Sequence, residues 1–86
     1  MEQTEEMQVG KVTHYFAKIG VAVIELEKDL KVGDKIHFTG HGVDFAQEVE
    51  SMQIEHDQIP HAKKGQSIGL KTKGPVKNGC IVEFTE

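Results

Sequence analysis

KVGDKIHF, residues 31–38, contains the pattern that decides the fold of this chain of 86 residues. A lysine opens the stretch, a glycine follows two positions later, and Ile36 and Phe38 stand on alternate positions. The same pattern returns as KKGQSIGL at residues 63–70 and as KNGCIVEF at residues 77–84. The copies begin 32 and then 14 residues apart, so they do not form a tandem repeat.

The third position of each copy is predicted to be a turn residue. Gly33, Gly65 and Gly79 occupy it, and glycine accepts a positive φ without a clash between side chain and backbone. The apolar pair that follows has the period of a strand with one face turned inward. A reused entry from a turn into a strand is the favoured interpretation, and a shared ligand site is the alternative.

Two apolar segments near the N-terminus predict a hairpin. VGKVTHYF (9–16) alternates, which places Val12, His14 and Phe16 on one side of a strand. IGVAVIEL (19–26) is apolar on both sides, as expected for a strand buried on two faces. The two residues between the segments are enough for a hairpin turn.

DFAQEVESMQIEH, residues 44–56, gives conflicting signals. Phe45, Val49 and Met52 are spaced by four and three, which is helical spacing. Every neighbouring segment predicts a strand, however, and a lone helix between hairpins is the less common architecture. We therefore predict a strand with a β-bulge near Glu50–Ser51 that restores the register, and we keep a helix as the alternative.

Together these segments predict an all-β fold, a small closed antiparallel six-stranded β-barrel. Closure of such a barrel removes the exposed strand edges that promote aggregation. A chain of this length makes one domain. We assign residues 9–86 to a single β-barrel domain and residues 1–8 to a flexible acidic leader.

The net charge of −4 hides an asymmetry between the two parts of the chain. Residues 1–62 hold twelve acidic residues and five lysines, whereas residues 63–86 hold five lysines and two acidic residues. Every basic residue other than histidine is a lysine. The absence of arginine argues against a surface that reads nucleic-acid sequence, because the planar guanidinium group makes the bidentate contacts to phosphate and guanine.

The lysines near the C-terminus are the feature that points to a partner. No acidic residue occurs between Ala62 and Val82. If these lysines share one face, they form a positive stripe. Such a stripe binds phosphate backbones through counterion release, without reading sequence. The alternative is that strand edges carry lysine to discourage pairing between chains. The five residues of this lysine tract are Lys63, Lys64, Lys71, Lys73 and Lys77.

The sequence contains no motif that carries chemistry. The P-loop, the dinucleotide-binding fingerprint and the G-x-S-x-G nucleophile motif are all absent. The five histidines lack metal-ligand spacing, and the single cysteine, Cys80, is predicted to fill space in a strand. We therefore expect a protein that is not an enzyme, with no catalytic residue, no metal, no cofactor and no bound nucleoside triphosphate.

The same composition predicts a cytoplasmic protein without a membrane partner. No apolar run approaches the roughly 18 residues that span a bilayer. The first residues, MEQTEEMQ, lack the apolar core of a secretion signal. A lone cysteine also suits a reducing compartment.

Five motifs follow one another in the order Val9-Gly-Lys-Val12, Leu30-Lys-Val-Gly-Asp-Lys-Ile36, Val49-Glu-Ser-Met52, Ala62-Lys-Lys-Gly65-Gln-Ser-Ile-Gly-Leu70 and Val76-Lys-Asn-Gly79. This order resembles domain II of translational GTPases, the small β-barrel beside the nucleotide-binding domain in elongation factor Tu. The opening GKVTHYF and the stretch Ser-Met-Gln at 51–53 also resemble the barrel that ends some collagenase-like peptidase-family proteins, several of which act on RNA. No GTPase accompanies the barrel here, and no RNA-contacting family residue aligns with a position of this chain.

The resemblance implies two roles for a stand-alone, non-catalytic barrel. In the first, the barrel is an accessory module that binds RNA or a ribonucleoprotein through the lysine tract. In the second, it is a protein–protein adaptor that docks on a separately encoded peptidase-like or RNA-modifying enzyme. Both remain open at this point, because function depends on sites rather than on folds.

Overall fold

A computed structural model describes residues 8–55 and 57–85 of the chain. Residues 1–7 of the predicted leader lie outside this part, and Gln8, its last residue, begins the first strand. Among the described residues, no helix is long and apolar enough to cross a membrane. The strands are β1 (Gln8–Phe16), β2 (Val21–Leu26), β3 (Leu30–Lys31), β4 (Lys35–Gly40), β5 (Val43–Glu48), β6 (Met52–Ile54), β7 (Asp57–Ile59), β8 (His61–Ala62), β9 (Ser67–Lys71) and β10 (Ile81–Phe84).

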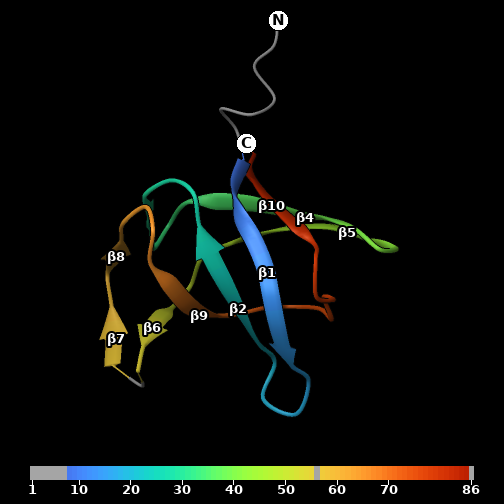
Figure 1. Cartoon of the computed structure of the whole chain (residues 1–86), viewed down its shortest axis with the longest axis horizontal. Helices are drawn as coiled ribbons and strands as arrows, with labels where there is room; N and C mark the ends of the chain where they lie inside the picture. The colour runs from blue at the N-terminus through green and yellow to red at the C-terminus, as the bar shows by residue number, and fades with distance from the viewer. Residues whose placement is uncertain (1–7, 56, 86) are drawn as a thin grey trace, which may run out of the picture.

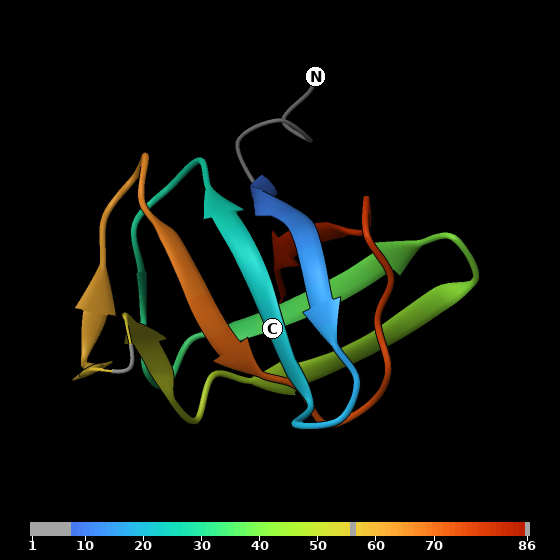
Figure 2. The ribbon, with the colours of Figure 1, turned by 60° about the horizontal axis from the view of Figure 1, so that its bottom comes forward.

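Eight of the strands form one antiparallel sheet in the order β5-β4-β10-β1-β2-β9-β6-β7, and β3 pairs with β8 in a small second sheet. The long sheet is strongly bent (Figure 1). Figure 2 shows β1, β2 and β9 in one layer, with β4 and β5 crossing behind them. The sheet therefore folds over on itself, and its two halves enclose a core.

The core lies between these two layers and is apolar. Phe38 on β4 is fully buried, and its ring centroid lies 5.2 Å from that of Phe45 on β5. Burial of such side chains is the main favourable term in the stability of a small domain. The buried apolar residues are Val9, Val12, Ala22, Ile24, Leu26, Leu30, Ile36, Phe38, Val49, Met52, Ala62, Ile68, Leu70, Val76, Cys80 and Val82.

The prediction of an all-β, antiparallel fold is confirmed, but the closed six-stranded barrel is wrong. Within the described part of the chain, the sheet has eight strands and ends at β5 on one side and at β7 on the other. The short strand β3 precedes the predicted turn at Gly33 and was not predicted. The segment around Pro60 adds β7 and β8, where no strands were predicted.

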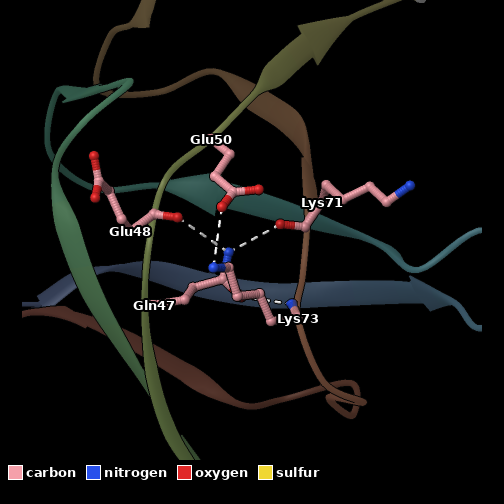
Figure 3. Close-up of polar contacts among 5 residues, drawn as sticks. All are labelled: Gln47, Glu48, Glu50, Lys71 and Lys73. Carbon is pink, nitrogen blue, oxygen red and sulfur yellow. Dashed lines mark hydrogen bonds and ion pairs between the residues drawn. The ribbon is translucent and has the colours of Figure 1, made fainter.

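A side chain, rather than a strand ladder, connects β5 to the end of β9 and to the chain just after it (Figure 3). Gln47 on β5 donates from Nε2 to the carbonyl oxygen of Lys71 at 3.0 Å, and its Oε1 accepts from the backbone N–H of Lys73 at 2.7 Å. The Gln47 side chain is buried, with the residue only 6% exposed. We call this contact the Gln47 seam. It joins β5 to the chain around Lys71–Lys73, which a closed barrel would join through backbone hydrogen bonds.

Residues 44–54 form most of β5, a short link and β6, and Glu55 is a turn residue with a φ of 51°, so the helical alternative is wrong; His56 lies outside the described residues. The bulge predicted near Glu50–Ser51 is also wrong. The chain breaks into β5 and β6 there, because β5 pairs with β4 while β6 pairs with β9. Val49 marks the crossing between these two parts of the sheet: its N–H donates to the carbonyl of Asp34 at 2.8 Å, and its carbonyl accepts from Gly33 at 2.9 Å.

The three copies of the opening pattern form three turns with the same hydrogen bonds. Gly33, Gly65 and Gly79 have φ values of 100°, 92° and 92°, as the turn interpretation requires. In each turn the N–H of position four donates to the carbonyl of position one at 3.1 Å. The side chain of position four also accepts from the N–H of position one: these acceptors are Asp34 Oδ2 at 3.1 Å, Gln66 Oε1 at 2.7 Å and Cys80 Sγ at 3.4 Å.

Removing one of these acceptors is expected to weaken the turn in a measurable way. Asp34→Ala leaves the N–H of Lys31 without its carboxylate partner and removes the 2.7 Å ion pair to Lys31 Nζ. We expect a loss of about 1–2 kcal/mol in the free energy of unfolding, measured by urea titration. Asp34→Asn keeps an acceptor oxygen and is expected to lose less than about 1 kcal/mol, since an exposed ion pair contributes little. Equal losses for both variants would contradict the backbone role.

Candidate functional site

The structure distributes the predicted lysine tract along both ends of one strand. Lys63 and Lys64 lie in the turn before β9, whereas Lys71 ends β9 and Lys73 follows it. β9 spans five residues, so its ends are about 13 Å apart along the backbone. Lys77 begins the last turn, before β10. The lysine tract therefore lies in three separate places: the turn before β9, the other end of β9, and the turn before β10.

Acidic residues from other parts of the chain lie beside the tract. Lys73 Nζ forms an ion pair with Glu50 at 3.0 Å (Figure 3), and the backbone N–H of Lys64 donates to the Asp29 carboxylate at 2.9 Å. Asp29 and Glu50 are distant in sequence, which is why a count of charges along residues 63–86 did not reveal them. Lys71 carries its charge away from the Gln47 seam in Figure 3.

The described histidines and acids do not gather into a metal site. No group of three histidine, cysteine or acidic side chains within residues 8–55 and 57–85 could hold a metal ion. His37 instead hydrogen-bonds to Asp44 within the β4–β5 hairpin, and His61 lines an open hollow of about 440 Å³ beside β3 and β8. Asp29 and Asp34, which also line this hollow, already accept hydrogen bonds from turn residues.

Apolar side chains gather on the outer face of the sheet, on the side away from the core. Val21 and Val23 on β2 alternate with the fully buried Ala22 and Ile24, and they are half-buried. Phe16 and Ile19, beside them, are 46% and 59% exposed. Exposed apolar side chains are ordinary when they are scattered, but a contiguous group is typical of an interaction site. We call Phe16, Ile19, Val21 and Val23 the outer patch.

A bulge in β1 places Phe16 in the outer patch, and it corrects the predicted alternation of this strand. The register between β1 and β2 shifts between Val12 and His14. As a result, Val12 points into the core, whereas His14 and Phe16 point outward and stack with ring centroids 4.4 Å apart. Tyr15 packs against the core instead. A bulge adds one residue to one strand, so all the side chains after it change face.

The outer patch borders an open hollow of about 420 Å³ between β2, β9 and β6. Gly69 on β9 forms its floor: a Cβ atom at this position would lie 3.3 Å from Val21 Cγ1 and 3.4 Å from Gln53 Cγ. Gln53, Ile54 and Glu55 on the β6 side complete the rim. The arrangement can receive an apolar side chain from another molecule, and the polar side chains of its described lining are those of Gln53, Glu55 and Ser67.

The outer patch was not predicted, although the sequence holds a signal for it. Residues 19–26 are apolar on both faces, and we expected both faces to be buried within the domain. A domain of 86 residues has only one core. The second apolar face of such a strand therefore has to meet either solvent or a partner.

Comparison with known proteins supports both resemblances proposed from the sequence. No family model matches the chain. The chain is 40% identical over 75 residues to an uncharacterized protease of Methanocaldococcus jannaschii and 38% identical over 76 residues to a collagenase of Porphyromonas gingivalis. These alignments cover 86% and 85% of this chain. It is also 41% identical over 51 residues, or 57% of its length, to elongation factor 1-alpha of Methanocella arvoryzae.

The chain spans about a fifth of the length of the protease and collagenase relatives, 18% in each case. It covers 12% of the elongation factor. Among solved structures, the C-terminal domain of a U32 peptidase of Geobacillus thermoleovorans matches with a TM-score of 0.89 over 100% of both chains, at 21% identity. Its selenomethionine variant matches with a TM-score of 0.84, at 23% identity, over 88% of this chain and 96% of that one. At these identities the structural likeness shows the fold.

Proposed function

We propose that this chain is a non-catalytic protein-docking domain whose partner is a peptidase-like enzyme. The outer patch carries this proposal, because the core is already filled and these apolar side chains face outward. The protease and collagenase relatives place a matching segment within a chain about five times as long. In such a chain the segment can pack against the remaining part, and the outer patch is the surface suited to that contact.

The distribution of lysines favours protein docking over RNA binding. A phosphate backbone is held by several cations on one face. Here Lys73 is paired with Glu50, and β9 separates Lys63 and Lys64 from Lys71. RNA binding through the lysine tract stays a prediction, and the experiment below includes it as an outcome.

Binding in trans tests the proposal. The Methanocaldococcus jannaschii relative is produced without the 75 residues that match this chain, treated with nuclease, and titrated with this chain by isothermal calorimetry. We expect a complex of one copy of each chain that survives nuclease. Phe16→Glu should weaken it at least tenfold, because a charge in an apolar contact loses its hydration. The matched control Lys35→Glu changes an exposed residue on the opposite layer and should leave the affinity unchanged.

Two results would reject protein docking. The first is the absence of any complex when the excised segment of the relative itself still binds the truncated protein. The second is an association that requires RNA and is lost on nuclease treatment. In that case, Lys71→Glu with Lys73→Glu should abolish binding to labelled RNA at low salt, which would support the accessory RNA-binding role instead.

A further inference from the structure

The outer patch has charged ends of opposite sign. Strand register places Lys71 on β9 opposite Val21 at one end of the patch, and Lys18 lies in the adjoining turn. Four residues along β2 from Val21, register places Glu25 opposite Ser67. One end of the patch is therefore basic and the other acidic.

Further charged residues adjust the acidic end. Glu55 lines the hollow there, together with Ser67, and adds a second carboxylate. Lys11 on β1 lies opposite Glu25 in register and offsets one of the two negative charges. Lys63 and Lys64 lie in the turn beyond Ser67, where the Lys64 N–H donates to Asp29, and Lys63 lines the separate hollow beside β3 and β8. The basic end, by contrast, has two lysines and no acidic residue among the hollow's described lining on that side. A net dipole therefore runs along β2, across an apolar centre.

This layout is complementary to itself. When two copies of a face pack through a two-fold axis that lies in the interface and crosses the strands, each strand of one copy runs opposite to the same strand of the other. The basic end of each copy then lies over the acidic end of its partner, and the two apolar centres meet. Isologous contacts of this kind use the same surface twice, and opposed charges select the orientation.

We propose that the outer patch pairs with the outer patch of a second copy of this chain. Phe16 and Ile19 lose their exposure to water in the pair, and Lys18 and Lys71 of each copy face Glu25 and Glu55 of the other. This pairing does not depend on the docking to a peptidase-like enzyme, although both use one surface. The enzyme and the second copy would then compete, so that pairing covers the outer patch of the free chain.

The mass in solution tests the pairing directly. The monomer has a mass of 9.6 kDa. The patch is small, so we expect a weak dimer, with the weight-average mass in sedimentation equilibrium rising toward twice this value between about 10 µM and 1 mM. Phe16→Glu should shift the transition at least tenfold in concentration. A mass that stays at the monomer value up to about 1 mM would overturn the proposal.

Paired charge reversals decide whether the proposed orientation is correct. Variant A, Glu25→Lys with Glu55→Lys, has two basic ends, and variant B, Lys18→Glu with Lys71→Glu, has two acidic ends. Each alone should dimerise at least tenfold more weakly than the natural chain. An equimolar mixture of A and B should recover the dimer, because every basic end then meets an acidic one.

The controls separate this orientation from general charge effects. All four reversed side chains are exposed, so both variants should keep the circular dichroism spectrum of the natural chain. Lys35→Glu with Lys77→Glu changes the net charge as much as variant B but lies outside the patch, and it should leave the dimer unchanged. Loss of the dimer in this control, or a mixture of A and B that stays as weak as each variant alone, would overturn the proposal. If the chain stays monomeric but binds the truncated relative, the proposed pairing is wrong and the proposed docking function stands.

Discussion

Gly10→Ala is expected to destabilise this protein strongly. Gly10 is buried in β1, between Leu26 of β2 and Val82 of β10. A Cβ atom there would overlap the carbonyl oxygen of Glu25 and approach Ile24 Cγ2 to 3.0 Å. The carbonyl belongs to the backbone of a central strand, so it cannot move without disturbing the pairing of β1 with β2.

The expected loss for Gly10→Ala is at least about 3 kcal/mol in the free energy of unfolding. A domain of this size has a total stability of about 4–10 kcal/mol, so the melting temperature should fall by about 15 °C or more. Gly69→Ala is the matched control, because it adds the same methyl group in the neighbouring strand pair. Its Cβ would approach the side chains of Val21 and Gln53 to 3.3 and 3.4 Å and the backbone oxygen of Gln53 only to 3.7 Å, an ordinary contact, so we expect a change within about 1 kcal/mol. Similar melting temperatures for the two variants would contradict this account.

Gln47→Leu is expected to open the Gln47 seam. The substitution keeps the approximate volume of the side chain but removes its hydrogen bonds to Lys71 and Lys73, together with the longer one, 3.4 Å, to the carbonyl of Glu48. The N–H of Lys73 and the carbonyl of Lys71 then lose their partners at a site where Gln47 itself is 6% exposed. An unpaired polar group in such a place costs about 1–3 kcal/mol, so we expect a total loss of about 2–4 kcal/mol in urea unfolding.

Two further measurements make the Gln47 prediction specific. The amide proton of Lys73 should exchange with solvent faster in Gln47→Leu than in the natural chain, by more than the global loss of stability explains. The control Glu48→Leu changes the exposed neighbour on the same strand and should stay within about 0.5 kcal/mol of the natural chain. Unchanged stability in Gln47→Leu would mean that water or neighbouring groups replace the seam.

Local patterns along the chain were enough to predict antiparallel strands and the three glycine turns, but the number of strands and the closure of the sheet were predicted wrongly. Alternating apolar residues and the glycines at 33, 65 and 79 mark strands and turns directly, since both depend on near neighbours. The end of the sheet at β5 depends on Gln47, a polar residue that sequence patterns assign to the surface. Its burial follows from contacts with Lys71 and Lys73, more than twenty residues away.

The candidate site was harder to predict for a related reason. Lysines that are close in sequence were expected to share a face, but β9 carries Lys64 and Lys71 to opposite ends. Phe16 was expected on the same side as Val12, and the bulge in β1 turned it outward. No glycine occurs at the bulge, between Val12 and His14, so no local signal in the sequence indicates it. Only the double-faced apolar pattern of residues 19–26 indicated that a second surface was needed.

The pairing of β1 with β10 has a consequence for how the chain folds during synthesis. β1 is synthesised before β10, so one of its edges stays unpaired until Ile81 and Val82 are made and pair with Lys11 and Gly10. Closing so long a loop is slow, because its entropy is lost before the contacts form. The sheet is complete only when β10 pairs with β1, and until then the exposed edge of β1 can pair with the wrong strand.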